Sequence, residues 1–164
     1  MGWLAGYSYR RKLTIDKDKV DASLTDFTVL AAFTNTNMRI SEMQADGDDI
    51  RFTESDGTTL LKYEVERFDQ AGNKVEAHVK VPSVSSSVDT DIYVYYVNAS
   101  ATDGQDATNT WNSNYKGVWH MNDNTTSTFL DSTSNNNDAT KVAAGEPAEA
   151  DAKRIEHRCQ RAGT

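Results

Sequence analysis

Short stretches in which apolar and polar residues alternate recur along the first hundred residues, and they predict strands rather than helices. Every second residue from Tyr7 to Ile15 falls on one side of an extended chain, which is typical of a half-buried strand. Residues 26–33 are mostly apolar on both sides, which predicts a central strand. Further extended segments are expected at residues 50–53, 60–68, 73–81, 91–97 and 116–121.

Turn-forming residues separate these segments. Gly47 stands in an aspartate-rich turn, Asp56-Gly57 forms another, and Pro82 precedes a serine-rich stretch. Residues 35–44 show no clear period, so they predict either a short helix or an irregular crossover. Seven short extended segments separated by turns predict an all-β fold, an antiparallel β-sandwich of the jelly-roll-like kind.

A change in composition along the chain predicts its domain organisation. Residues 1–105 are expected to form the β-sandwich module. Residues 106–141 are rich in Asn, Ser, Thr and Asp, so we expect a linker followed either by the partial start of a second domain or by an added strand. Residues 142–164 carry no strand pattern, which predicts a tail, a linker or residues appended to the chain.

Charge and composition exclude several classes of partner. The chain has 164 residues and a net charge of −8, so its surface is expected to repel nucleic acid and anionic membranes. No apolar stretch is long enough for a membrane-spanning helix. The single cysteine, Cys159, has no partner for an internal disulfide. The first residues lack a signal-peptide pattern, and we expect a piece of a longer protein rather than a chain that stays inside the cell.

Several blocks of the sequence together resemble a known family. The most distinctive block is Asp-Asp-Ile-Arg-Phe-Thr at residues 48–53, which is followed by Tyr-Glu-Val-Glu at residues 63–66. Over residues 3–100 the chain resembles a prokaryotic domain of unknown function that occurs in modular cell-surface and secreted proteins. In that family the domain commonly precedes a concanavalin-like, laminin-G-like jelly roll, and residues 111–122 and 131–138 resemble the opening of that jelly roll.

The resemblance implies a location and a function. It implies that the chain is secreted or lies at the cell surface, and that only a truncated start of the second domain is present. By association with sugar-binding neighbours, it also implies that the domain recognises glycans.

Aromatic side chains are the first group of candidate sugar contacts, because flat rings stack on the C–H face of a sugar ring. The candidates are Tyr9, Tyr95, Trp111 and Trp119. The alternative for each of them is a place in the core, since a sandwich needs large side chains to fill it.

Charged side chains form the second group of candidates. If the apolar residues of the segment 49–52 point inward, Asp49 and Arg51 lie together on the opposite face. Glu64 and Glu66 alternate with their apolar neighbours in the same way. We expect either a cross-strand ion pair between Arg51 and a glutamate, or a polar patch that hydrogen-bonds sugar hydroxyls.

Two aspartates in a tight turn are the candidate metal ligands. Asp46 and Asp48 flank Gly47 and offer the oxygen atoms that Ca²⁺ accepts, although the spacing is not that of an EF-hand. The alternative is an acidic turn without a metal. No cofactor is expected to be required.

Little in the sequence favours an enzyme. His78, His120 and His157 are scattered without metal-ligand spacing, and no Gly-x-Ser-x-Gly motif or phosphate-binding loop is present. We therefore predict a non-catalytic carbohydrate-binding module of a larger secreted or surface protein, which binds polysaccharide and is covalently linked to neighbouring domains. The alternative is a structural or adhesive spacer domain whose polar face packs on the domain that follows.

Overall fold

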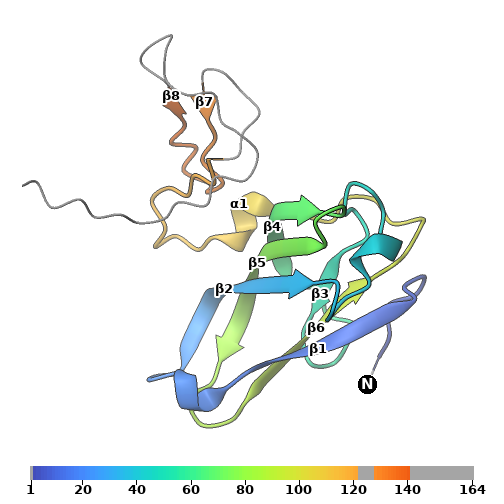
Figure 1. Cartoon of the computed structure of the whole chain (residues 1–164). Coiled ribbons are helices and arrows are strands. Elements are labelled where there is room, and N and C mark those ends of the chain that lie inside the picture. Colours follow the sequence, from blue (N-terminus) through green and yellow to red (C-terminus); the bar gives the residue numbers. More distant parts are fainter. Residues whose placement is uncertain (1, 122–127, 141–164) are drawn as a thin grey trace, which may run out of the picture.

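The computed structural model describes residues 2–121 and 128–140, and it contains two antiparallel sheets that enclose a common core (Figure 1). One sheet has the strand order β1-β6-β3, with β1 at Tyr9–Ile15, β6 at Thr90–Tyr96 and β3 at Arg51–Thr53. The other has the order β2-β5-β4, with β2 at Leu24–Thr34, β5 at Lys74–Val84 and β4 at Lys62–Asp69. The predicted all-β antiparallel sandwich is confirmed.

Helical structure in the described residues consists of single turns. They are η1 at Lys17–Lys19, η2 at Ile40–Glu42 and α1 at Ala107–Thr110. None of these helices is long and apolar enough to cross a membrane.

The core lies between the two sheets and follows the alternation of the strands. In β5 the side chains of Val75, Ala77, Val79 and Val81 are buried, whereas the residues between them are partly exposed. Phe52 contributes a fully buried ring from β3 in the opposite sheet. Complete burial of one such valine or phenylalanine side chain stabilises the fold by about 1.5–3 kcal/mol. The apolar positions at period two therefore hold the sheets together.

Two predicted elements differ from the structure. The strand at residues 26–33 was expected to be central, but β2 pairs only with β5 in the described sheet and forms its edge. The prediction was wrong because it took the apolar residues on both faces of this strand as a sign that both faces are buried. Leu30, on the outer face, is apolar yet 60% exposed. Residues 116–121 form no strand, since the N–H of Val118 bonds to the carboxylate of Asp131 instead of to a neighbouring strand.

The N-terminal residues cover the outer face of the β1-β6-β3 sheet. The guanidinium of Arg10 lies over the rings of Trp3 and Tyr93, 4.6 Å from each centroid. It also donates to the hydroxyl of Tyr95 at 2.9 Å, and that hydroxyl donates to the carbonyl of Gly57 at 2.8 Å. The turn at Gly57 is thereby fastened to the sheet.

Replacing Gly57 by alanine should lower the free energy of unfolding by about 1–3 kcal/mol. A β-carbon there would stand 2.5 Å from the carbonyl oxygen of Gly2 and 2.8 Å from Nη1 of Arg10. The φ of +81° is also unfavourable for any residue with a side chain. Urea titration followed by tryptophan fluorescence measures the effect. Ser55→Ala, in the same turn, is the matched control, and equal stability of the two variants would contradict the prediction.

The segment 106–140, described at residues 106–121 and 128–140, contacts the outer face of the β2-β5-β4 sheet, with α1 beside β4 (Figure 1). The hydroxyl of Thr28 donates to the carbonyl of Thr110 at 2.8 Å, and Nδ2 of Asn112 donates to the carbonyl of Asp26 in the edge strand. Further along, β7 at Thr128–Phe129 pairs with β8 at Ala139–Thr140. The division of the chain at residue 105 stays a prediction, and the predicted tail at residues 142–164 lies outside the described residues.

Candidate functional site

Strand pairing gathers three polar side chains on the outer face of the β2-β5-β4 sheet. Glu64 of β4 lies directly opposite His78 of β5 in the register of this antiparallel pair. The register then shifts between Val65 and Arg67, and Glu66 lies at this irregularity. The carboxylate of Glu66 reaches the imidazole of His78, with Oε2 and Nε2 2.7 Å apart.

The carboxylate of Glu64 contacts three residues of the segment 106–140. It accepts hydrogen bonds from Nε1 of Trp111 at 2.7 Å and from Oγ of Ser132 at 2.6 Å. Nε2 of His120 lies 3.0 Å from Oε2 of Glu64, within ion-pair distance. Glu64 is only 9% exposed, and burial alone would raise its pKa. The contacts with His120, Ser132 and Trp111 outweigh burial and lower the pKa of Glu64 below its ordinary value.

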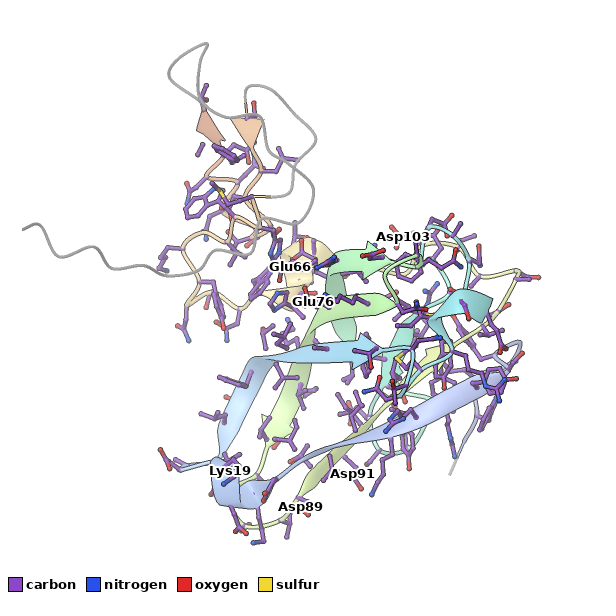
Figure 2. All side chains as sticks on the ribbon, in the orientation of Figure 1. Lys19, Glu66, Glu76, Asp89, Asp91 and Asp103 are labelled. Carbon is purple, nitrogen blue, oxygen red and sulfur yellow. The ribbon has the colours of Figure 1, made fainter. Side chains whose placement is uncertain are left out.

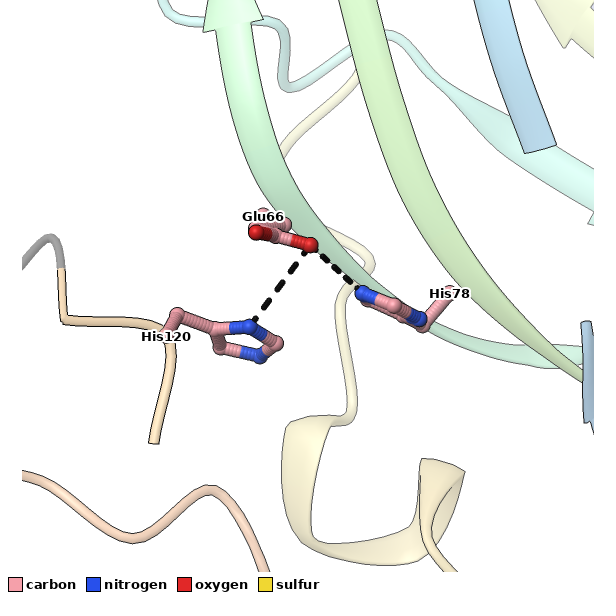
Figure 3. A group of neighbouring side chains, drawn as sticks. All are labelled: Glu66, His78 and His120. Carbon is pink, nitrogen blue, oxygen red and sulfur yellow. Dashed lines mark hydrogen bonds and ion pairs between the residues drawn. The ribbon is translucent and has the colours of Figure 1, made fainter. Parts of the chain in front are cut away.

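Glu66, His78 and His120 form a compact cluster at the junction of the sheet and the segment (Figure 3). Oε2 of Glu66 lies 2.7 Å from Nε2 of His78 and 3.7 Å from Nδ1 of His120. The two imidazoles stack with their centroids 5.3 Å apart and their planes at 24°. The potential ligand atoms of the three residues lie within 4.8 Å of one another. Imidazole nitrogen and carboxylate oxygen together suit a divalent transition metal.

Aromatic rings cover one side of this cluster. The indole of Trp111 is 8% exposed, and its centroid lies 4.8 Å from that of His78 and 6.0 Å from that of His120. Tyr115 packs edge-on against Trp111 at 5.0 Å. These rings keep water from part of the cluster, so charge interactions there are stronger than on an open surface.

The carboxylate of Asp131 is the centre of a hydrogen-bonded loop. This loop joins Val118, two residues before His120, to Thr133, the residue after Ser132. Oδ1 of Asp131 accepts from the N–H groups of Val118 and Thr133, both at 2.9 Å. Oδ2 accepts from the N–H of Asn137 at 2.9 Å and from the hydroxyl of Thr133 at 2.8 Å. Burial alone would raise the pKa of Asp131, but these hydrogen bonds outweigh it and lower the pKa to about 2.

This loop should lose stability as the pH falls from about 4 towards 2. An unfolded aspartate has a pKa of about 3.9, so the lowered pKa of Asp131 stabilises the folded loop above that value. The stabilisation is lost as the pH falls through the folded pKa of about 2. Protection factors of the Val118 and Asn137 amides, measured by hydrogen exchange across this range, report the change.

The matched variant is Asp131→Asn. It should remove this acid dependence and should also weaken the loop at neutral pH, because an amide nitrogen cannot accept the N–H of Asn137. Protection factors of the native loop that stay constant down to pH of about 2 would contradict the assignment.

Arg51, expected in a polar patch with the glutamates, lies in the other sheet. β3 pairs with β6 whereas β4 pairs with β5, so the expected cross-strand pair between Arg51 and Glu64 or Glu66 does not form. The guanidinium instead donates to the carbonyl of Ile50 at 2.6 Å and to the hydroxyl of Tyr63 at 3.0 Å. Arg51 thus joins a strand of one sheet to a core residue of the other.

The aspartates before β3 are also engaged locally. Asp49 is 1% exposed, and its carboxylate accepts from the N–H groups of Gln44 at 3.1 Å and Asn98 at 3.2 Å. The expectation that Asp49 lies on an open face is therefore wrong. Oδ1 of Asp46 accepts from the N–H of Asp48 at 3.2 Å within the predicted turn. A calcium site at Asp46 and Asp48 stays a prediction.

The four aromatic candidates are distributed over different parts of the molecule. Tyr95 is fully buried and Tyr9 half-buried in the β1-β6-β3 sheet. Trp111 is buried against the β2-β5-β4 sheet. Trp119 is 40% exposed, and its Nε1 donates to the carbonyl of Asn137 at 3.0 Å. The structure therefore brings Trp111 to Glu64 and Glu66 but places Tyr9 and Tyr95 elsewhere.

Sequence reasoning missed His78, His120 and Ser132 as partners of the glutamates. One signal was available, because His78 alternates with buried apolar residues of β5 in the same manner as Glu64 does in β4. His120 and Ser132 offered none, since their positions depend on how the following segment packs. His157 lies outside the described residues.

Comparison with known proteins identifies a family. A family model described as Domain of unknown function (DUF2341) matches residues 46–141, a range that contains Glu66, His78 and His120. No curated protein and no solved structure matches the chain. The expected jelly roll after the domain, and its truncation, stay predictions. Because the matched range spans more than half of the sequence, the chain belongs to this family of domains of unknown function.

Proposed function

We propose that the chain is a non-catalytic structural module of a larger secreted or cell-surface protein, and that its β2-β5-β4 sheet seats the part of the chain that follows. The observation that carries the proposal is the carboxylate of Glu64, which Trp111, Ser132 and His120 contact from three separate points of the segment. A buried carboxylate with several partners holds them in one arrangement, since leaving any partner unpaired is costly. A fixed junction of this kind sets the direction in which a neighbouring domain leaves the module.

The side chains expected to bind a glycan serve internal contacts instead. Arg51 donates to protein carbonyls, Asp49 accepts from backbone N–H groups, and the ring of Tyr95 is covered by Trp3. Sugar-binding surfaces need exposed rings or a polar groove with unused hydrogen-bonding groups. These contacts support the structural role over the carbohydrate-binding one.

Glycan binding remains the second candidate because of Trp119. Its indole lies close against the backbone of Gly117, where an added β-carbon would stand 2.2 Å from the ring. The hydrogen bond to Asn137 further fixes the ring, and 40% of the residue stays exposed. A flat, held and exposed indole is the kind of surface on which a sugar ring stacks.

Affinity electrophoresis against soluble β-glucans, mannans, xylans, alginate and chitin fragments, with and without Ca²⁺, separates the two candidates. For a structural module we expect the same mobility in every gel. Retardation by one polysaccharide that is abolished in Trp119→Ala, but not in the N-terminal Trp3→Ala control, would overturn the proposal in favour of glycan binding.

A further inference from the structure

We propose that Glu66, His78 and His120 bind a divalent transition metal of the Zn²⁺ class, and that this ion fastens the segment 106–140 to strands β4 and β5. The three ligands come from three places in the chain: one from each of two paired strands and one from the segment packed on them. A site assembled in this way is complete only when the segment is seated.

The donor set and its spacing fit such an ion. Two histidines and a glutamate are a three-ligand set used for zinc, with a further position open for water. Bonds of about 2.0–2.1 Å in a tetrahedral arrangement separate ligand atoms by roughly 3.3 Å. The distances from Oε2 of Glu66 to Nε2 of His78 and Nδ1 of His120, 2.7 and 3.7 Å, lie on either side of that value. All three ligand atoms lie within 4.8 Å of one another, so rotation of the side chains would bring them around one ion.

Glu64 supplies the outer partner that a metal-bound histidine needs. When Nδ1 of His120 faces Glu66, its other ring nitrogen, Nε2, lies 3.0 Å from Oε2 of Glu64. Metal-binding histidines usually direct their second nitrogen to a carboxylate or carbonyl, which fixes the ring and its tautomer. Glu64 is in turn held by Trp111 and Ser132, so the ring of His120 is positioned from both sides.

Exposure and charge are also suitable. The side chains of His120, His78 and Glu66 are 11%, 18% and 35% exposed, so the cluster is shielded yet open on the side of Glu66. Two carboxylates, of Glu64 and Glu66, lie close to the imidazoles and together balance a charge of +2. The sulfur-free nitrogen and oxygen set favours Zn²⁺ or a similar ion over Ca²⁺, which prefers oxygen ligands alone.

The test titrates the full-length chain with Zn²⁺ by calorimetry and with Co²⁺ by visible absorption, in the background His157→Ala/Cys159→Ser. This background removes two other potential ligands that occur near the end of the sequence. We expect one Zn²⁺ per chain, a rise in melting temperature on binding, and Co²⁺ absorption bands typical of a site with imidazole ligands. His78→Gln and Glu66→Gln should each weaken Zn²⁺ binding at least tenfold, while Glu76→Gln on the same face of β5 should not.

The outcomes distinguish the metal site from the proposed structural role, on which it does not depend. Failure of the folded background protein to bind Zn²⁺, or unchanged affinity in both His78→Gln and Glu66→Gln, would overturn the metal site. Circular dichroism checks that each variant is folded. If the segment 106–140 still resists proteolysis without metal, the structural role stands alone. If the background protein binds Zn²⁺ through Glu66 and His78 and a polysaccharide also binds at Trp119, the structural role fails and the metal site stands.

Discussion

Replacing Glu64 by alanine is expected to release the segment 106–140 from the sheet. The change leaves the indole N–H of Trp111 and the hydroxyl of Ser132 without their acceptor, and it removes the carboxylate beside His120. Removing one member of a buried charged network costs about 3–5 kcal/mol. We expect this loss chiefly as weaker attachment of the segment, so protease cleavage within residues 112–121 and 128–138 should become fast while the sandwich stays folded.

Two variants calibrate this result. Glu64→Gln keeps one acceptor oxygen and should release the segment only in part. Glu76→Gln changes a glutamate of β5 on the same side of the sheet, shown beside Glu66 in Figure 2, and should leave protease resistance unchanged. If Glu64→Ala resisted cleavage as well as the native chain does, the carboxylate would not be what holds the segment.

Arg51→Ala is expected to lower the free energy of unfolding of the whole sandwich by about 3 kcal/mol. The guanidinium donates to the carbonyls of Asp48, Ile50 and Thr102 and to the hydroxyl of Tyr63, which is itself 2% exposed. Alanine leaves these acceptors without a charged donor in a partly buried place. Urea titration followed by circular dichroism measures the loss.

The matched control is Arg51→Lys. An ammonium group keeps the charge but cannot reach several acceptors with the fixed fork of a guanidinium, so it should recover only part of the stability. If Arg51→Ala were as stable as the native chain and instead lost binding to a polysaccharide, Arg51 would be a ligand contact and not a structural one.

The strands could be predicted from the sequence because burial imposes period two on them. Ile50 and Phe52 are both buried, as their alternation with charged residues indicated. The order of strands in each sheet could not be predicted in this way, since alternation gives a strand two faces but does not say which neighbours pair with it. That is why Arg51 was expected beside Glu64, although β3 and β4 belong to different sheets.

The candidate site was only partly within reach of the sequence. Glu64, Glu66 and Trp111 were identified as functional candidates from residue type and alternation, and the structure brings them together. His120 was not, because no local pattern links it to β4. Its position depends on the packing of a polar, irregular segment, and such packing arises from tertiary hydrogen bonds such as those of Asp131.

The position of β2 at the edge of its sheet has a consequence for self-association. An edge strand of this length with exposed Leu24, Phe27 and Leu30 is a template on which a strand of another molecule can add. Nδ2 of Asn112 donates a hydrogen bond to the carbonyl of Asp26 on this strand. The segment 106–140 therefore takes up one acceptor that an added strand would use. We therefore expect that a variant whose segment is released from the sheet would also associate more readily through this edge.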